Sequence, residues 1–315
     1  MSHILDDFLF FGHPGTNECL KGIQSFLQFT QSVGLPVKQE KTVWPSTHVE
    51  MHGIMFDSTT MTLSLPLDKV SKAHELIDSC FKKRKVRAIV IQQIHGLLNF
   101  ACRAVPPGRT FLRRIANLLK GVTSNAHFIR LNKEARKDLQ AWKYFLSNFN
   151  CAPIMLPIQW SLDVDWKLFS DASGRGYAGI FGSHWVAGEF PDSWQDKSIA
   201  VKELAPIYIT FTFWVKLLAN SKILFLMDNY SVVHVLRSKT SRDPILMGMI
   251  RKMVVLSMLH NITFSANHIV GKHNVISDLI STFQVEKARE LAPWLDEQPT
   301  KIPRGFLPWC NRTLT

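Results

Sequence analysis

Cysteine is scarce in this sequence of 315 residues, and its five cysteines are widely scattered (Cys19, Cys80, Cys102, Cys151 and Cys310). No two of them have the close spacing that zinc ligands and redox motifs require. Their odd number also argues against a disulfide framework. The sequence therefore predicts no zinc site and no secretion, and an intracellular location, nuclear or cytoplasmic, is expected.

Long apolar runs are missing as well. The most apolar stretch, PIYITFTFWVKLLA, is interrupted by Lys216 and is too short to span a bilayer. The first residues, MSHILDDFLFFG, place acids inside the apolar run and lack a basic leader, so no signal peptide is expected. With 46% hydrophobic and 20% charged residues the chain has the composition of a folded protein, and no membrane partner is predicted.

Acidic residues are in deficit, and the deficit is local. The chain has 37 Lys and Arg against 25 Asp and Glu, a net charge of +12. Residues 66–150 carry 17 Lys and Arg against 5 Asp and Glu, which accounts for the whole excess. A concentrated positive region attracts a polyanion, so nucleic-acid backbone is expected to bind residues 66–150; the alternative is a solvated helical face.

A chain of this length is expected to form two domains joined by a linker. The first half is predicted to contain a hairpin at residues 4–12, a helix at 16–33, a loop and strand after Gly34 and a hairpin that turns at 57–60. The predicted units, in chain order, are these hairpins and helix (1–65), a basic and mostly helical region broken at a Pro-Pro-Gly (66–150), a linker with two prolines (151–164), an α/β domain (165–283) and an extended, weakly ordered tail with further prolines (284–315). Because prolines restrict the linker, the two halves are expected to fold as separate units.

Strand and helix patterns alternate in the second half. The expected elements are strands near 166–171, 177–182 and 184–190, a helix at 198–218, a strand at 223–227, helices at 229–237 and 243–259, a strand at 262–267 and a helix at 274–281. Three consecutive strands followed by alternating helices and strands predict an α/β sheet covered by helices on its faces.

Four acidic residues lie at the edges of apolar runs in this unit, where a carboxylate is costly unless it is paired, hydrogen-bonded or bound to a metal. Their contexts are DWKLFSDASGRGYAGIFG for Asp171, SIAVKELAPI for Glu203, KILFLMDNYSVVHVL for Asp228 and ANHIVGKHNVISDLIS for Asp278. Taken singly, each has an ordinary explanation as a turn cap, a helix N-cap or a first-turn acid. As an ordered set they predict convergent metal ligands, and two Mg²⁺ or Mn²⁺ ions are the expected cofactors.

These contexts resemble the ribonuclease H domains of reverse-transcribing elements, through DASGRGYAG, KEL, MDN and HIVGKHNVISDLIS. The stretches SVVHVLRSKTSRDPILMGMIRKM and STFQVEKARELAPWLDEQPTKIP are most similar to retroelements of the DIRS type. The resemblance implies a mixed sheet with helices on both faces and Mg²⁺-dependent cleavage of the RNA strand of an RNA–DNA hybrid. The family often ends in Asp-Ala-Leu-Ser-Arg; this chain reads DLIST from Asp278, so the acid is kept and the basic residue is lost.

A histidine near the site assists catalysis in many ribonucleases H, and the resemblance makes His268 and His273 the candidates here. A lone histidine also fits a structural role, so both explanations stay open for each.

The N-terminal half resembles the palm of a reverse transcriptase. ILDDF is similar to the hairpin that carries two adjacent aspartates, here Asp6 and Asp7, and GLPVKQEKT and VEMHGIMF are similar to the two palm motifs that follow. Residues 66–150 then stand where thumb and connection would lie. Only five residues precede Asp6, so a complete polymerase site is not expected; an ordinary surface turn is the alternative for the aspartates.

Basic residues that punctuate the helical region and one turn of the α/β unit are the candidate contacts to phosphate, which position a duplex without reading its sequence. They are Lys82, Lys83, Arg84, Lys85, Arg113, Arg114 and Lys272. The leading hypothesis is a ribonuclease H-type nuclease acting on RNA–DNA hybrid. The alternatives are a non-catalytic nucleic-acid-binding remnant of a retroelement and one part of a larger RNA-directed DNA polymerase.

Overall fold

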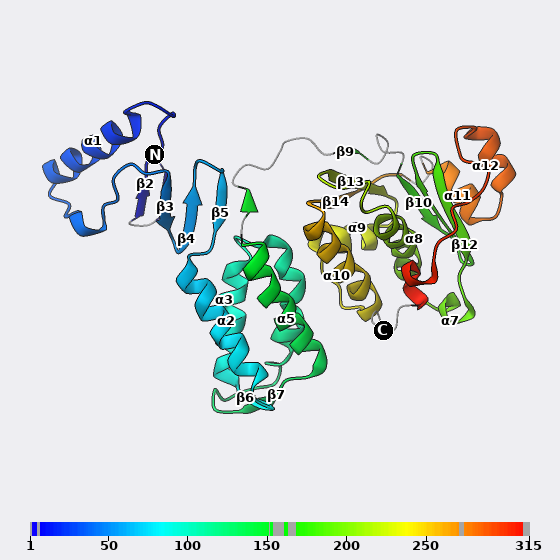
Figure 1. The fold of residues 1–315 in the computed structure, drawn as a ribbon, viewed down its shortest axis with the longest axis horizontal. Helices are drawn as coiled ribbons and strands as arrows, with labels where there is room; N and C mark the ends of the chain where they lie inside the picture. The colour runs from blue at the N-terminus through cyan, green and yellow to red at the C-terminus, as the bar shows by residue number, and fades with distance from the viewer. Residues whose placement is uncertain are drawn as a thin grey trace.

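The computed structural model describes residues 2–4, 7–150, 152–153, 161–162, 168–270 and 274–310. Asp6, Lys272 and His273, which the sequence singles out, lie outside the described residues. Figure 1 shows three regions in chain order: small β-sheets with one helix, a group of helices, and an α/β region.

The first region begins with the predicted hairpin and helix. β1 (Ser2–Ile4) and β2 (Asp7–Leu9) are antiparallel, and α1 (Glu18–Ser32) follows them. The ring of Phe26 on α1 lies 4.5 Å from that of Phe8 and 5.5 Å from that of Phe10, between centroids. The prediction of a strand after Gly34 is wrong. The residues there are exposed and form a 3₁₀ helix, η1 (Gln39–Lys41), and no described strand pairs with them.

The next sheet is larger than the single predicted hairpin. Its antiparallel strands, in order, are β3 (His48–Met51), β4 (Ile54–Asp57), β5 (Thr62–Ser64) and β8 (Ala152–Pro153). The predicted turn after Asp57 joins β4 to β5. A tighter turn joins β3 to β4, because His52 and Gly53 both adopt positive φ, 49° and 71°, as a two-residue hairpin turn of type I′ requires.

The basic region is helical, as predicted. Its helices are α2 (Leu67–Phe81), α3 (Ala88–Ala101), α4 (Arg113–Asn117) and α5 (Lys133–Asn148), with the 3₁₀ helix η2 (Pro106–Phe111) at the predicted break. At that break Gly108 lies against Trp142, and a Cβ at this position would come within 2.4 Å of the indole ring. A short antiparallel pair, β6 (Lys85–Arg87) with β7 (Phe128–Arg130), was not predicted.

Five of the six described strands of the α/β region lie where the sequence predicts them, and the sixth, at residues 161–162, lies in the predicted linker. They are β9 (Ser161–Leu162), β10 (Phe169–Ala172), β11 (Gly176–Phe181), β12 (His184–Glu189), β13 (Lys222–Met227) and β14 (Thr263–His268). In the described part of the chain they form two three-stranded sheets, antiparallel β10-β11-β12 and parallel β14-β13-β9. The mixed α/β class is confirmed. The single mixed sheet is not found among these residues, because β9 pairs with β13 along Ile223 and Leu224, on the edge opposite β14.

Helices cover the antiparallel sheet on both faces, as expected. The helices of this region are α7 (Asp192–Gln195), α8 (Ile199–Phe213), α9 (Tyr230–Ser238), α10 (Pro244–Leu259) and α11 (Val275–Ser281). All six residues of β11 are buried. Ala178 and Ile180 pack in one cluster with Ile280 of α11, while a Cβ on Gly179 would meet Thr210 of α8 at 2.3 Å. Alternation along the strand therefore separates the two covered faces.

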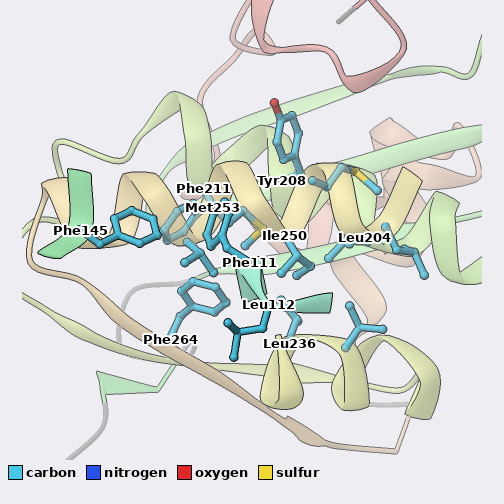
Figure 2. Close-up of a cluster of buried hydrophobic side chains, with 14 of the residues drawn as sticks. Phe111, Leu112, Phe145, Leu204, Tyr208, Phe211, Leu236, Ile250, Met253 and Phe264 are labelled. Atoms are coloured by element: carbon cyan, nitrogen blue, oxygen red, sulfur yellow. The ribbon is translucent and has the colours of Figure 1, made fainter. Parts of the chain in front are cut away.

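The helical region and the α/β region share one hydrophobic core. Figure 2 shows Phe111 and Phe145 of the helical region close to Ile250 and Met253 of α10, and all four are buried in the same cluster. Two halves that fold separately would each have a core of their own, so the shared core differs from that prediction. The sequence of the linker carries no information about contacts between the regions on either side of it.

A buried group of charges crosses the same interface. Asp138 on α5 is 1% exposed and accepts hydrogen bonds from Arg114 at 3.3 Å and from Arg251 of α10 at 3.5 Å. The guanidinium of Arg251 also lies 6.0 Å above the ring of Phe111. Burial raises the pKa of Asp138 to about 6 against the opposing effect of both arginines. The two regions therefore depend on one another for the pairing of these charges.

The predicted extended tail is wrong in its described part. It contains α12 (Val285–Leu291) and the 3₁₀ helices η4 (Arg304–Phe306) and η5 (Pro308–Cys310). Ala288 and Leu295 are buried against β11 and β12, and Trp309 lies 5.2 Å from Trp194 and 5.3 Å from Tyr177 between ring centroids. Its apolar side chains give the tail enough buried surface to fold despite its prolines. Across the described residues, no helix is long and apolar enough to cross a membrane.

Candidate active site

Asp171 lies at the centre of the candidate site, on β10. This strand places the residue opposite Ala178 of β11, and the residue is 9% exposed. The hydroxyl of Ser281 on α11 donates a hydrogen bond to its Oδ2 at 2.5 Å. Burial raises the pKa of Asp171, the charges of Asp278 and Asp228 raise it further, and the Ser281 hydrogen bond opposes them. The carboxylate is therefore held in place from the helix that also carries Asp278.

Glu203 is the second buried acid and lies in the first turns of α8. It is 8% exposed, and no described residue forms an ion pair or side-chain hydrogen bond with it. Burial raises its pKa to about 8, and the neighbouring charges of Asp171 and Asp228 contribute in the same direction. A carboxyl group in this environment is stabilised by gaining either a proton or a cation.

Asp228 and Asp278 are exposed and complete the set. Asp228 follows the last residue of β13, at the carboxyl end of a parallel pair of strands, where α/β proteins usually bind their ligands. The side chain of the next residue, Asn229, caps α9 by accepting from two backbone N–H groups, so the N-cap role that was open for Asp228 belongs to Asn229. Asp278 is in the first turn of α11.

Each of the other three acids is linked electrostatically to Asp171. Asp171 is influenced by the charges of Asp228 and Asp278, and Glu203 by those of Asp171 and Asp228, although the four residues come from four different elements. None of them pairs with a cationic side chain among the described residues. This donor set, carboxylates only and partly desolvated, fits hard divalent cations. As they lie in the described part of the chain, no three His, Cys, Asp or Glu side chains could hold a metal ion together, so metal binding would require the carboxylates to move closer to one another.

Two supporting residues were not singled out from the sequence. Lys202 is 6% exposed, and its ammonium donates to the carbonyl of Gly174 at 2.7 Å and to that of Gln195 at 2.6 Å. It thereby ties the loop after β10 to the helix that carries Glu203. Ser281 is the other, and it lies three residues after Asp278 on the same face of α11, a spacing that could have indicated its role.

His268 is at the end of β14, and its Nε2 donates to the backbone carbonyl of Asp228 at 3.1 Å. Its ring is stacked on that of Tyr230, with 3.8 Å between centroids. His268 is therefore adjacent to the site, and its hydrogen bond and its ring stack fix its side chain. Its Nδ1 is the nitrogen that can make other contacts.

Asp7 differs from these acids in its surroundings. Its side chain is 61% exposed, at the start of β2, and its only described ionic contact is with His52 at 3.5 Å. Asp7 therefore lacks the buried surroundings of Asp171 and Glu203.

The predicted phosphate contacts divide into two groups. Lys82, Lys83, Arg84 and Lys85 are exposed at the end of α2 and in β6. Arg113 and Arg114 instead contact the protein: Arg113 donates to Thr240 at 3.5 Å, and Arg114 binds Glu134 at 2.7 Å as well as Asp138. These two arginines belong to the interface between the helical and α/β regions, which a run of basic residues cannot reveal.

Similarity between this chain and known proteins is found among solved structures. No family model matches the chain, and no curated protein sequence matches it. Among solved structures it is similar to the foamy viral protease-reverse transcriptase in complex with RNA/DNA hybrid, with 13% identity, a TM-score of 0.39 and coverage of 93% of this chain and 37% of that one. The same foamy viral protein in complex with dsDNA gives 15% identity, a TM-score of 0.37 and coverage of 80% and 51%. The chain thus spans about half or less of the length of these structures.

Proposed function

We propose that this protein is a metal-dependent endonuclease of the ribonuclease H type that cleaves the RNA strand of an RNA–DNA hybrid. One observation carries the proposal: Asp171 interacts electrostatically with three carboxylates from three other elements, Asp171 and Glu203 are buried, and no cationic side chain of the described residues pairs with any of the four. Such an arrangement is costly unless a ligand of opposite charge binds there.

Asp171, Glu203, Asp228 and Asp278 would hold two Mg²⁺ or Mn²⁺ ions. When bound, such ions stabilise charge on the attacking and leaving oxygens of a phosphodiester and lower the pKa of the attacking water. The protein contributes the position of the ligands: Ser281 orients Asp171, and Lys202 fixes the loop beside it. Glu203 must lose its proton before it can serve as a ligand, because its pKa is about 8.

An exposed basic surface on the helical region supports a nucleic-acid substrate. The exposed cations at Lys82 to Lys85 are suited to phosphate contacts that do not depend on sequence. A nuclease that accepts any hybrid must recognise groove shape and 2′-hydroxyl groups instead of bases. The resemblance to retroelement ribonucleases H, of the DIRS type above all, supports the same substrate.

Cleavage of a labelled RNA–DNA hybrid by the purified full-length chain tests the proposal. We expect RNA-strand products with Mg²⁺ or Mn²⁺, none in EDTA, and none from an all-DNA duplex. Glu203→Gln should lose the activity, whereas Glu286→Gln, an exposed acid on α12, should retain it. Cleavage that survives in EDTA or in Glu203→Gln would contradict the proposal.

A non-catalytic nucleic-acid-binding protein is the second candidate, favoured by the exposed basic run at Lys82 to Lys85. It predicts hybrid binding that weakens with salt and with replacement of these lysines, in the absence of any cleavage. As part of a larger RNA-directed DNA polymerase, the chain would cleave hybrid only after addition of the partner polypeptide.

A further inference from the structure

Two aromatic rings form a flat stack beside Asp228. The ring of Tyr230, the first residue of α9, lies 3.8 Å from that of His268 between centroids, at an interplanar angle of 9°. Tyr230 is nevertheless 72% exposed. One face of its ring therefore rests on the histidine, and much of the remaining surface is open to solvent.

Backbone interactions fix the positions of both residues. His268 pairs in register with Met227 of β13 and donates its Nε2–H to the carbonyl of Asp228. The backbone of Tyr230 is fixed because the side chain of Asn229 caps the helix immediately before it. A surface whose geometry is set before binding loses little conformational entropy when a ligand arrives.

The position of this stack separates it from other exposed aromatic residues. Tyr144 on α5 is 46% exposed, but its ring makes an edge contact with Phe149 and no parallel stack. Phe11 and Phe29 are exposed in the N-terminal region. Tyr230 is two residues from Asp228, so whatever stacks on it lies next to the candidate reaction centre.

We propose that the Tyr230–His268 stack is a binding subsite for one unpaired nucleobase adjacent to the cleavage site. A planar base extends a column of parallel rings, and base–aromatic stacking tolerates any sequence because every base has a π face. Bases inside a duplex have both faces covered by neighbours, so a base at a duplex end or single-strand junction is the one that fits. This inference rests on the proposed function in one respect, namely that the ligand of this surface is a nucleic acid.

The test compares two hybrids that differ by one nucleotide. Fluorescence anisotropy in EDTA gives the Kd of a blunt RNA–DNA hybrid and of the same hybrid extended by a single unpaired 2-aminopurine nucleotide. We expect the wild-type protein to bind the extended hybrid about 5- to 150-fold more tightly. Tyr230→Ala should remove this gain, while Tyr230→Phe should keep it, because stacking requires the ring and not the hydroxyl. Tyr144→Ala is the matched control and should also keep it.

A second readout follows the unpaired base directly. The fluorescence of 2-aminopurine should be quenched on binding to the wild-type protein and to Tyr230→Phe, and not on binding to Tyr230→Ala. Equal Kd values for the two hybrids with wild-type protein, or a gain that survives in Tyr230→Ala, would overturn the subsite. Absence of cleavage in Mg²⁺ with the gain intact would contradict the nuclease proposal and leave the subsite standing, so the two failures are distinguishable.

Discussion

Residues 7–65 and residues 168–310 contain similar elements but bury very different amounts of surface. In the first region few side chains are buried, among them Ile23 and Ile54, and large apolar residues such as Phe11 and Phe29 are 66% and 60% exposed. In the second, all of β11 and most of α8 are buried, and Phe211 is 1% exposed. Regular strands and helices are thus not sufficient for a core, which requires a second layer to cover them.

The difference in burial between the two regions also determines which acids have an altered environment. Asp7 and Glu203 both come from motifs with a metal-binding resemblance, yet Asp7 is exposed beside His52 while Glu203 is buried beside two other carboxylates. Water stabilises the charge of an exposed carboxylate, whereas a buried one depends on what the protein places next to it. The difference locates the candidate chemistry in the α/β region.

Replacing the site acids should have the largest effect. Asp228→Asn and Glu203→Gln should each reduce hybrid cleavage by at least about a thousandfold, since removal of one ligand disables a site that works as a unit. Asp7→Asn should leave the initial rate nearly unchanged. A comparable loss of cleavage with Asp7→Asn would show that the first region also has an active site. The same conclusion would follow if the purified chain extended a primer on a template and Asp7→Asn abolished that extension.

The interface charges should dominate stability. Asp138→Ala leaves Arg251 buried without its anion, and we expect a loss of about 3–5 kcal/mol in the free energy of unfolding, measured by urea denaturation. Asp78→Ala is the matched control: it removes a 2.7 Å ion pair with Lys143 that is 42% exposed on both sides, and its effect on stability should be much smaller. Similar losses for the two variants would mean that the shared interface contributes little.

The interface also sharpens the question of separate folding. If the two halves are independent, limited proteolysis near residues 150–164 should yield a stable C-terminal fragment whose unfolding is unaffected by Asp138→Ala in the intact chain. If the shared core joins them, the fragment should unfold more readily than the intact chain, because Ile250 and Met253 lose contacts with Phe111 and Phe145.

Core and surface aromatics give a direct comparison of the two regions. Phe211→Ala should destabilise the protein by about 3–5 kcal/mol through lost burial and the cavity left behind. Phe29→Ala should change stability by about 0.5 kcal/mol or less, since its side chain is already largely in water. A large loss with Phe29→Ala would indicate that α1 is covered in solution, for example by a second polypeptide.

The smallest expected effect is on pH-dependent stability without divalent cations. Glu203 has a pKa near 4.5 when unfolded and about 8 when folded, so the folded state binds the proton more tightly. Its contribution is fully present below pH 4.5 and is lost as the pH rises through 8. The Tm of wild-type protein should therefore fall, relative to that of Glu203→Gln, by roughly a few degrees over this range.

Divalent cations should reverse this trend. Because Mg²⁺ competes with the proton on Glu203, it should raise the Tm of wild-type protein more at pH 8 than at pH 6. Glu203→Gln should show a smaller rise at both pH values. An equal rise in the variant would place the bound cation elsewhere.

The sequence was informative about elements and about the candidate site, for separate reasons. Apolar periodicity located β10 to β14 and α8 to α11 to within a few residues, because each buries a regular face. The order and contexts of Asp171, Glu203, Asp228 and Asp278 predict a metal site, and in the structure the other three acids are linked electrostatically to Asp171. The prolines of the tail predict an extended chain, whereas the helical spacing around Ala288 prevails in the structure and forms α12.

By itself, then, the sequence determined which segments become strands and helices and which acids stand at their ends, since both depend on local pattern. Only the tertiary structure decided that Ser281 bonds to Asp171, that Lys202 ties a loop to α8, and that Arg113 and Arg114 serve an interface instead of a ligand. It also decided that Tyr230 stacks on His268. These contacts join residues distant in the chain, and their strength depends on burial, which no short stretch of sequence specifies.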